Sequence, residues 1–249
     1  MRLTVLQITD THLFESPLAS MHGVNTQKSL EAVLDRGLSE VAPDLVLATG
    51  DIAETPGKAV YRRFRDTVTS RYGGPFVCVP GNHDRQVPFE SVLSRSRHGA
   101  AGWDIIGIDT HIEDHVEGYV HEAELRRLDA ELAAADGDVV VVGHHCPVEI
   151  GSPVFDRHRI VNGEELTGLL NVYNCVRAYV CGHIHQPFDT FAGDVRILAT
   201  PSTCFQYASG NADSLLDDDS APGYRWIELG DNGHFDTGVS RIDDMSGRN

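Results

Sequence analysis

Aspartate, asparagine and histidine recur at five places in the 249-residue chain, each time after a short apolar run. The five polar blocks are Asp10-Thr11-His12, Gly50-Asp51, Gly81-Asn82-His83-Asp84, Gly143-His144-His145 and Gly182-His183-Ile184-His185. Carboxylate and imidazole groups together suit borderline metals such as manganese, iron, zinc and cobalt, whereas sulfur ligands would indicate copper or an iron–sulfur cluster. The five blocks therefore predict a metal site.

These blocks hold more candidate ligands than one metal ion can use. The seven candidates are Asp10, His12, Asp51, Asn82, His144, His183 and His185. Two metals held about 3.5–4 Å apart suit phosphate-ester hydrolysis, because they activate a bridging water and clamp the attacking and leaving oxygens. Asp51 is the only acid in its block, so we predict that it bridges the two metals. His83 is then left for proton transfer or for a contact with the phosphate.

The first half of the chain predicts a βαβαβ unit that positions three of the blocks. Strands are predicted over residues 3–9, 45–49 and 76–80, and helices over 27–41 and 58–72, where apolar residues recur at helical spacing. Right-handed crossovers would gather the first three blocks at one sheet edge, where ligands bind in α/β proteins. We expect the intervening residues 13–24 to form a loop near this site.

The second half continues with strands and helices and ends in alternating segments. Strands are predicted over 103–108, 139–142 and 178–181, and helices over 123–135 and 163–170. The last third alternates like antiparallel strands over 195–200, 224–229 and 234–239, with a hairpin turn at Asp231-Asn232-Gly233. Residues 211–222, which include Asp217-Asp218-Asp219, are expected to form a solvated loop.

The composition excludes several classes of protein. A formal net charge of −17, from 37 acidic and 20 basic residues, disfavours binding to polymeric nucleic acid, because such binding depends on basic side chains. A small anionic substrate stays compatible if metal ions reverse the local charge. No apolar run reaches the roughly 18 residues of a membrane helix, and no signal peptide is recognisable. We therefore expect a single cytoplasmic domain over residues 1–249, with no membrane partner and with five reduced cysteines.

Other polar residues have simpler expected roles. Surface or loop positions are expected for the histidines outside the five blocks, which are His22, His98, His111, His115, His121, His158 and His234. Of these, His22 and His158 are the candidates for lining the pocket. Asp84 is expected to cap a turn by accepting hydrogen bonds from backbone amides.

In this order, the five blocks resemble those of the calcineurin-like metallophosphoesterases, and the resemblance extends over nearly the whole chain. It implies an α/β fold, namely a four-layer αββα sandwich of two mixed sheets with a two-metal site at the strand ends. It also implies a set of ligands for each metal: Asp10, His12, Asp51 and His185 for the first, and Asp51, Asn82, His144 and His183 for the second. By the same resemblance, Asn82 and His83 are catalytic, and together with His185 they contact the substrate.

Stretches outside the metal blocks resemble the class III cyclic nucleotide phosphodiesterases within that superfamily. They are residues 7–14, 23–26, 181–186, 199–204 and 221–225. The resemblance implies hydrolysis of 3′,5′-cyclic AMP to 5′-AMP by a hydroxide that bridges two metals. Iron and manganese are the first choice for these metals, with zinc or cobalt as alternatives. A small cyclic nucleotide is then the partner, and a homodimer is compatible with the resemblance.

Three alternatives stay open from the sequence. A broader phosphodiesterase or phosphomonoesterase, acting on other cyclic nucleotides or nucleotide esters, would use the same metal cluster and differ only in its pocket loops. Residues 84–103 and the acidic residues 215–220 match nothing in the family and leave base preference open. A binding or scaffold protein would lack metal ligands, and here no ligand position is missing. A nuclease is disfavoured by the acidic charge and by the absence of an appended basic domain.

Overall fold

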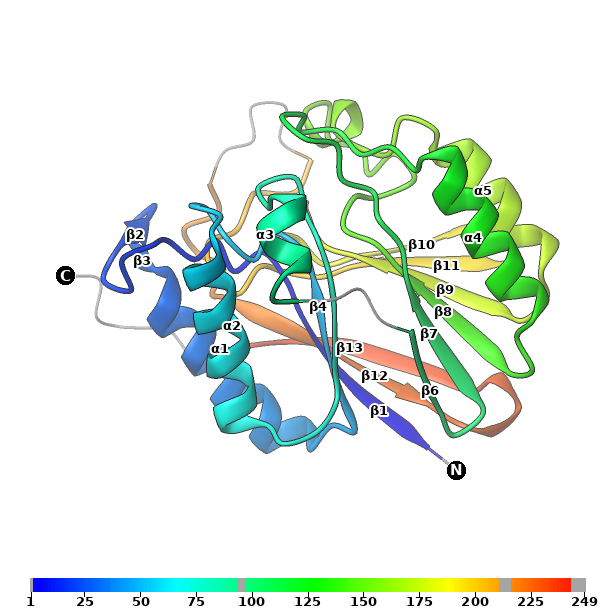
Figure 1. Cartoon of the computed structure of the whole chain (residues 1–249), viewed down its shortest axis with the longest axis horizontal. Coiled ribbons are helices and arrows are strands. Elements are labelled where there is room, and N and C mark those ends of the chain that lie inside the picture. Colours follow the sequence, from blue (N-terminus) through cyan, green and yellow to red (C-terminus); the bar gives the residue numbers. More distant parts are fainter. Residues whose placement is uncertain (1, 94–96, 211–215, 243–249) are drawn as a thin grey trace.

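The computed structural model describes residues 2–93, 97–210 and 216–242. Two sheets pack face to face, and helices cover the outer face of each sheet (Figure 1). This arrangement confirms the predicted four-layer αββα sandwich of two mixed sheets. That residues 1–249 form a single domain stays a prediction.

The first sheet contains the predicted βαβαβ unit and has the strand order β13-β12-β1-β4-β5. Its strands are β1 (Leu3–Ile8), β4 (Leu45–Thr49), β5 (Phe76–Val79), β12 (Gly223–Leu229) and β13 (Phe235–Arg241). Strands β1, β4 and β5 are parallel, and α1 (Thr26–Val41) and α2 (Lys58–Arg71) connect them. Strands β12 and β13 are antiparallel and meet at the predicted turn, Asp231–Gly233.

The second sheet has the order β10-β11-β9-β8-β7-β6. Its strands are β6 (Arg97–Ala100), β7 (Trp103–Gly107), β8 (Asp138–Val142), β9 (Val176–Cys181), β10 (Phe188–Ala192) and β11 (Val195–Ala199). Helices α4 (Glu122–Ala133) and α5 (Gly163–Val172) cover its outer face. Within the described residues, no helix combines the length and the apolar character needed to cross a membrane.

The sequence-based prediction was wrong or incomplete for several short segments. The strand over 195–200 was expected to be antiparallel, but β11 pairs parallel to β9 and antiparallel only to β10, which was not predicted. The short helix α3 (Gln86–Glu90) and strand β6 were also missed. Within the expected loop 13–24, Ser20–Met21 (β2) pairs with Val24–Asn25 (β3). The elements that were missed are short and partly exposed, so their apolar residues are too few to set a period. The direction of β11 depends instead on which strands lie beside it in the sheet.

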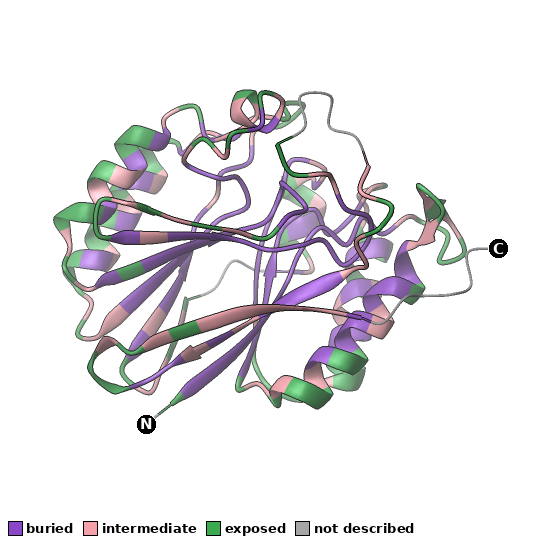
Figure 2. Cartoon of the chain, turned by 180° about the vertical axis from the view of Figure 1, so that it is seen from behind, coloured by how far each residue is buried: buried purple, intermediate pink, exposed green. Residues whose placement is uncertain are grey.

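Three apolar layers hold the sandwich together. The middle layer lies between the sheets and includes Leu3, Val5 and Leu47 from the first sheet and Val140 and Val180 from the second. The outer layers pack α1 and α2 on one sheet and α4 and α5 on the other. Figure 2 shows this burial as purple strands inside and green residues on the outer faces of the helices.

A buried polar network crosses from one sheet to the other. The side-chain amide of Gln7 in β1 donates to Thr49 Oγ1 and to the carbonyl oxygen of Cys181, both at 2.9 Å. Its Oε1 accepts a hydrogen bond from the Thr200 hydroxyl, which also accepts one from Arg225 Nε at 3.2 Å. Because Thr49 belongs to the first sheet and Cys181 to the second, the network ties the sheets together where both strands end.

We expect Gln7→Leu to destabilise the protein by about 1–3 kcal/mol, because the Thr49 hydroxyl and the Cys181 carbonyl oxygen would lose a buried partner. Urea unfolding followed by circular dichroism measures the change. The matched control is Gln86→Leu, an exposed position where a change within about 0.5 kcal/mol is expected. Equal stability of Gln7→Leu and the wild type would show that the network does not stabilise the sheet pairing.

Candidate metal centre

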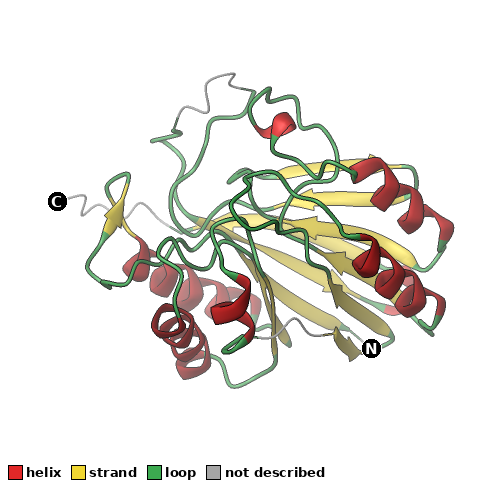
Figure 3. Ribbon diagram, turned by 45° about the horizontal axis from the view of Figure 1, so that its top comes forward, coloured by secondary structure: helices red, strands yellow, loops and turns green. Residues whose placement is uncertain are grey.

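The five polar blocks meet at one end of the two sheets, where the loops gather (Figure 3). The first three blocks follow β1, β4 and β5 of the first sheet, and the last two follow β8 and β9 of the second. The candidate ligands are all buried there, and the most exposed of them, Asn82, is 9% exposed. Each sheet therefore contributes part of one polar cluster.

Strained backbone marks this cluster. Five of the candidate ligands have φ between 45° and 69°, namely Asp10, His12, Asp51, His183 and His185. Such left-handed conformations are uncommon for residues other than glycine and cost about 1–3 kcal/mol each. They persist where the surroundings hold them, and here the amides of Asp10 and His12 donate to the carbonyl oxygens of Gly50 and Asp51 at 3.0 and 2.9 Å. Strain concentrated in one cluster is typical of a functional site.

The first group of ligand atoms belongs to Asp10, His12 and His185, which lie within 4.8 Å of one another. The Nδ1 atom of His12 donates to Glu54 Oε2 at 3.0 Å, and that of His185 donates to the carbonyl oxygen of Phe205 at 2.8 Å. In the neutral rings both Nε2 atoms therefore carry lone pairs, and these atoms lie 3.3 Å apart. Two facing lone pairs repel each other unless a cation binds both.

The second group of ligand atoms surrounds His144. Its Nδ1 donates to the carbonyl oxygen of Thr49 at 2.7 Å, so in the neutral ring Nε2 is an acceptor. Nε2 lies 3.2 Å from Asn82 Oδ1 and 3.4 Å from Asp51 Oδ2, which are also acceptors. The His183 ring is 5.2 Å from the His144 ring, and its buried Nε2 has no hydrogen-bond partner. This group also needs a cation.

Asp51 lies between the two groups. Its Oδ1 accepts a hydrogen bond from the His83 amide at 2.8 Å. Its Oδ2 is 3.8 Å from Nε2 of His12 in the first group and 3.4 Å from Nε2 of His144 in the second. This is the place that a bridging carboxylate must occupy, so the residues present fit a pair of metal ions. Ligation by the individual side chains stays a prediction.

Asp10 shows the same division of its oxygens. Oδ2 accepts hydrogen bonds from the Thr9 hydroxyl at 2.7 Å and from the His183 amide at 3.1 Å. Oδ1 is buried without a hydrogen-bond partner and lies 3.2 Å from Nε2 of His185. One oxygen therefore fixes the carboxylate, and the other is free for a metal.

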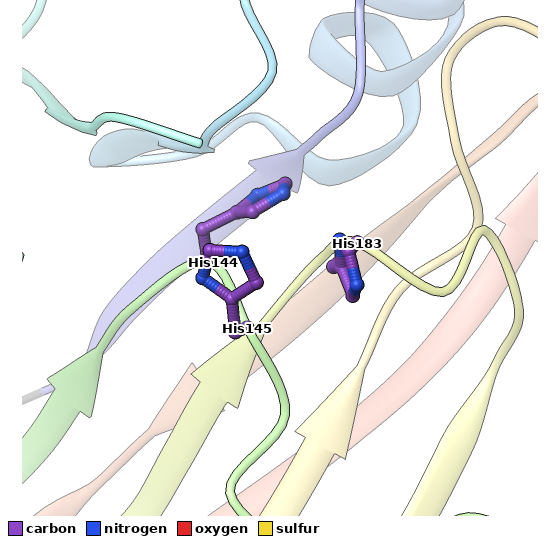
Figure 4. Close-up of side chains that lie close together, drawn as sticks. All are labelled: His144, His145 and His183. Carbon is purple, nitrogen blue, oxygen red and sulfur yellow. The ribbon is translucent and has the colours of Figure 1, made fainter. Parts of the chain in front are cut away.

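His145 is close to the second group but is already committed to other partners. Figure 4 shows His144 and His145 after one strand and His183 after its neighbour. The Nδ1 of His145 is 2.7 Å from Thr110 Oγ1, and its Nε2 is 3.1 Å from the carbonyl oxygen of Val116. Both ring nitrogens are thus used in hydrogen bonds, which agrees with leaving His145 out of the predicted ligands.

Glu54 is the residue of this site that the sequence analysis missed. Its Oε2 lies 3.0 Å from Nδ1 of His12 and 2.9 Å from Nδ1 of His83. One carboxylate therefore orients a candidate ligand and the histidine left for proton transfer, and Nε2 of each ring stays free. The only signal in the sequence is that Glu54 follows Asp51 by three residues.

Asp84 has the predicted capping role, over a wider region than its own turn. Its carboxylate accepts hydrogen bonds from the amides of Ile52 and Ala53 at 3.1 Å and of Gly81 at 2.9 Å. The Tyr61 hydroxyl adds a fourth bond at 3.0 Å. Asp84 thereby joins the loop after β4 to the loop after β5.

Among the histidines outside the blocks, His111 lies in a loop, which is one of the two expected placements. Its side chain is buried and its Nε2 has no hydrogen-bond partner. His22 is exposed, and its ring centroid lies 4.6 Å from that of Phe205 beside the site. That His22 lines the pocket stays a prediction.

Protons take over part of the role of a cation in the metal-free protein. Burial lowers the pKa of His144, but the neighbouring Asp51 outweighs this effect and the pKa is raised to about 9. Burial also opposes protonation of His83, whose pKa is likewise raised to about 9 by Asp51 and Glu54. For Asp51 itself, burial raises the pKa, but His144 and His83 hold it well below its usual range.

We expect the metal-free protein to lose stability as the pH rises from about 6.5 to about 9. The pKa values of His83 and His144 are higher in the folded protein than the ordinary 6.5. Their stabilising contribution is therefore complete below the ordinary value and disappears as the pH passes the folded value. The unfolding temperature with excess chelator, measured across this range, tests the prediction. Added manganese should raise the unfolding temperature, and a constant value without metal would contradict the prediction.

Residues 3–187 match the family described as calcineurin-like phosphoesterase. The chain belongs to the calcineurin-like phosphoesterase family. Members of this family use a dinuclear metal centre, and the His and Asp clusters described above could bind such metals. The family resemblance expected from the sequence is thus confirmed.

Several proteins of this family are similar over nearly the whole chain. One is the 3′,5′-cyclic adenosine monophosphate phosphodiesterase CpdA of Pseudomonas aeruginosa, 38% identical over 97% of this chain and 90% of that protein. CpdA of Escherichia coli K12 is 36% identical over 98% of this chain and 91% of its own.

Solved structures of phosphoesterases share the fold. A dimetal phosphatase from Danio rerio has a TM-score of 0.63 at 14% identity, covering 97% of this chain and 99% of that one. The purple acid phosphatase PPD1 of Lupinus luteus has a TM-score of 0.72 at 13% identity, covering 98% of this chain and 52% of that one.

Proposed function

We propose that this protein hydrolyses 3′,5′-cyclic AMP to 5′-AMP with two bound metal ions. The observation that carries the proposal is the convergence of acceptor atoms on both sides of Asp51 Oδ2, where His12 and His144 direct Nε2 toward the same oxygen. Full-length similarity to two phosphodiesterases named for cyclic AMP supports this choice of substrate.

The proposed ligands are those implied by the family resemblance. Asp10, His12, Asp51 and His185 hold the first metal, and Asp51, Asn82, His144 and His183 hold the second. When bound, such a pair of metals supplies an activated water and neutralises charge on the phosphate. Iron and manganese are proposed first, with zinc or cobalt as alternatives that the same nitrogen and oxygen ligands would accept.

Asn82, His83 and His185 are the proposed contacts to the substrate. With its Oδ1 3.2 Å from Nε2 of His144, Asn82 can donate its amide hydrogens to a phosphate oxygen. Glu54 holds Nδ1 of His83, so that Nε2 can donate a proton to the departing 3′ oxygen or a hydrogen bond to the phosphate. The cyclic nucleotide is the proposed partner, and a homodimer stays a prediction.

The substrate is tested with a panel of phosphate esters. We expect the protein to convert cyclic AMP to 5′-AMP with a higher kcat/KM than for cyclic GMP, 2′,3′-cyclic AMP or an aryl phosphodiester. Chelation should abolish all turnover, because the metals supply the nucleophile, and manganese should restore it. Comparable rates on all four esters would favour the broader phosphodiesterase. Full activity in chelator would contradict the metal-dependent reaction.

His83→Ala is expected to lower kcat by about 10²–10⁴-fold, the size of a positioned proton donor, without loss of metal. Glu54→Gln should lower kcat less, because the histidine is present but less well oriented. In the His83→Ala background Glu54→Gln should cost less than it does alone, because residues that act together are not additive and only the contact of Glu54 with His12 is then left to lose.

Steady-state kinetics and elemental analysis of the single and double variants measure these effects. Glu15→Gln, at an exposed position, is the matched control and should behave like the wild type. Unchanged turnover in His83→Ala would remove this residue from the mechanism. Fully additive losses would show that Glu54 does not act through His83.

A further inference from the structure

Aromatic rings line one side of the proposed metal centre. The proposed hydrolysis assigns no role to these rings. The Phe205 ring centroid lies 4.6 Å from that of His185 and 5.7 Å from that of His12. The Tyr207 ring lies 5.1 Å from His185. His22 packs on Phe205 at 4.6 Å. We call Phe205, Tyr207 and His22 the aromatic rim.

The aromatic rim has a fixed position relative to the candidate ligands. The Ser202 hydroxyl donates to the carbonyl oxygen of Asp10 at 2.8 Å, and the Thr203 amide donates to that of Thr9 at 3.0 Å. The carbonyl oxygen of Phe205 itself accepts the hydrogen bond from His185 Nδ1. The rim is therefore attached to the same backbone and side chains that form the metal centre.

The three rings differ in exposure. Phe205 is only 6% exposed, whereas Tyr207 is partly exposed and His22 is exposed. His22 and Tyr207 both meet Phe205 in T-shaped contacts, with interplanar angles of 66° and 88°. Phe205 thus supports the other two rings, and the surface open to a ligand belongs to Tyr207 and His22.

The Tyr207 ring reaches the metal end of this surface, because its centroid lies 5.1 Å from that of the candidate ligand His185. The residue is also partly exposed. Tyr207 therefore extends from the centre toward the outside of the site.

His22 lies at the turn of the β2–β3 hairpin, where it has φ 49° and Gly23 has φ 80°. The hairpin is held at its base by Asn25, whose Oδ1 accepts a hydrogen bond from the Lys28 amide at 2.8 Å at the start of α1. The Asn25 side-chain amide also donates to the carbonyl oxygen of Pro17 at 3.1 Å. This anchoring presents the His22 ring at the rim without a need to reorder the loop.

We infer that Tyr207 and His22 form the surface on which the nucleobase of the substrate stacks. The inference rests on the proposed function, because a phosphate held at the metals places the attached ribose and base over the adjoining wall. Stacking on an aromatic side chain strengthens binding of a base by about 5- to 150-fold. An aromatic surface also suits a purine better than an aliphatic phosphate ester, so the rim would select nucleotides.

The test compares cyclic AMP with ribose 3′,5′-cyclic phosphate, which has the same scissile bond and no base. The wild type should prefer cyclic AMP. In Tyr207→Leu and His22→Ala the ratio of the two kcat/KM values should fall by about 5-fold or more, since only the first substrate loses a stacking partner. Tyr207→Phe keeps the ring and should keep the ratio. Phe191→Leu, on the exposed edge strand β10, is the control and should also keep it.

The outcomes separate this inference from the proposed function. An unchanged ratio in both Tyr207→Leu and His22→Ala, with cyclic AMP still hydrolysed, would overturn the inference and leave the proposed function intact. Equal losses on both substrates would also overturn it, because they would indicate a disturbed metal centre. For variants too slow to assay, inhibition constants of 5′-AMP and ribose 5-phosphate against an aryl phosphodiester replace the ratio. No hydrolysis of cyclic AMP by the wild type would refute the proposed function and the inference with it.

Discussion

The structure depends on a set of hydrogen-bond acceptors that face one another. His12, His185 and His144 each use Nδ1 to donate to a carboxylate or carbonyl oxygen, so the opposite nitrogens direct lone pairs toward Asp10 and Asp51. In water these acceptors would move apart. In the buried site the fold holds them together against their mutual repulsion. Cations remove this repulsion, and in their absence protons on His83 and His144 do so in part.

Each sheet supplies only part of these acceptors. The two sheets must therefore pack face to face for the acceptors to meet. The Gln7 network joins the sheets below the centre, and glycines let the loops approach above it. A Cβ atom at Gly50 would lie 2.3 Å from Nδ1 of His144, and one at Gly81 would lie 2.2 Å from Oδ1 of Asp51. Any larger residue at these two positions would therefore push the Asp51 carboxylate or the His144 ring out of place. The left-handed backbone at five candidate ligands is a second cost of bringing them together.

Much of this arrangement could be predicted from the sequence, because the buried strands are apolar runs that end directly at Asp10, Asp51 and His144. The periodicity of apolar residues does not predict the role of a residue that depends on partners far away in the chain. Glu54 and the aromatic rim contact the centre only because loops from different strands meet, and β10 is defined mainly by pairing with β11. Nothing in the sequence pattern distinguishes Glu54 from a surface acid, and only the fold places it between His12 and His83.

We propose that two cations bind on either side of Asp51, one toward His12 and His185 and the other toward His144 and His183. Anomalous diffraction from crystals of the manganese-loaded protein tests it directly. Two peaks, one on each side of the Asp51 carboxylate, are expected. No peak at Asp51, or a single ion bound only by His144, His145 and His183, would contradict it.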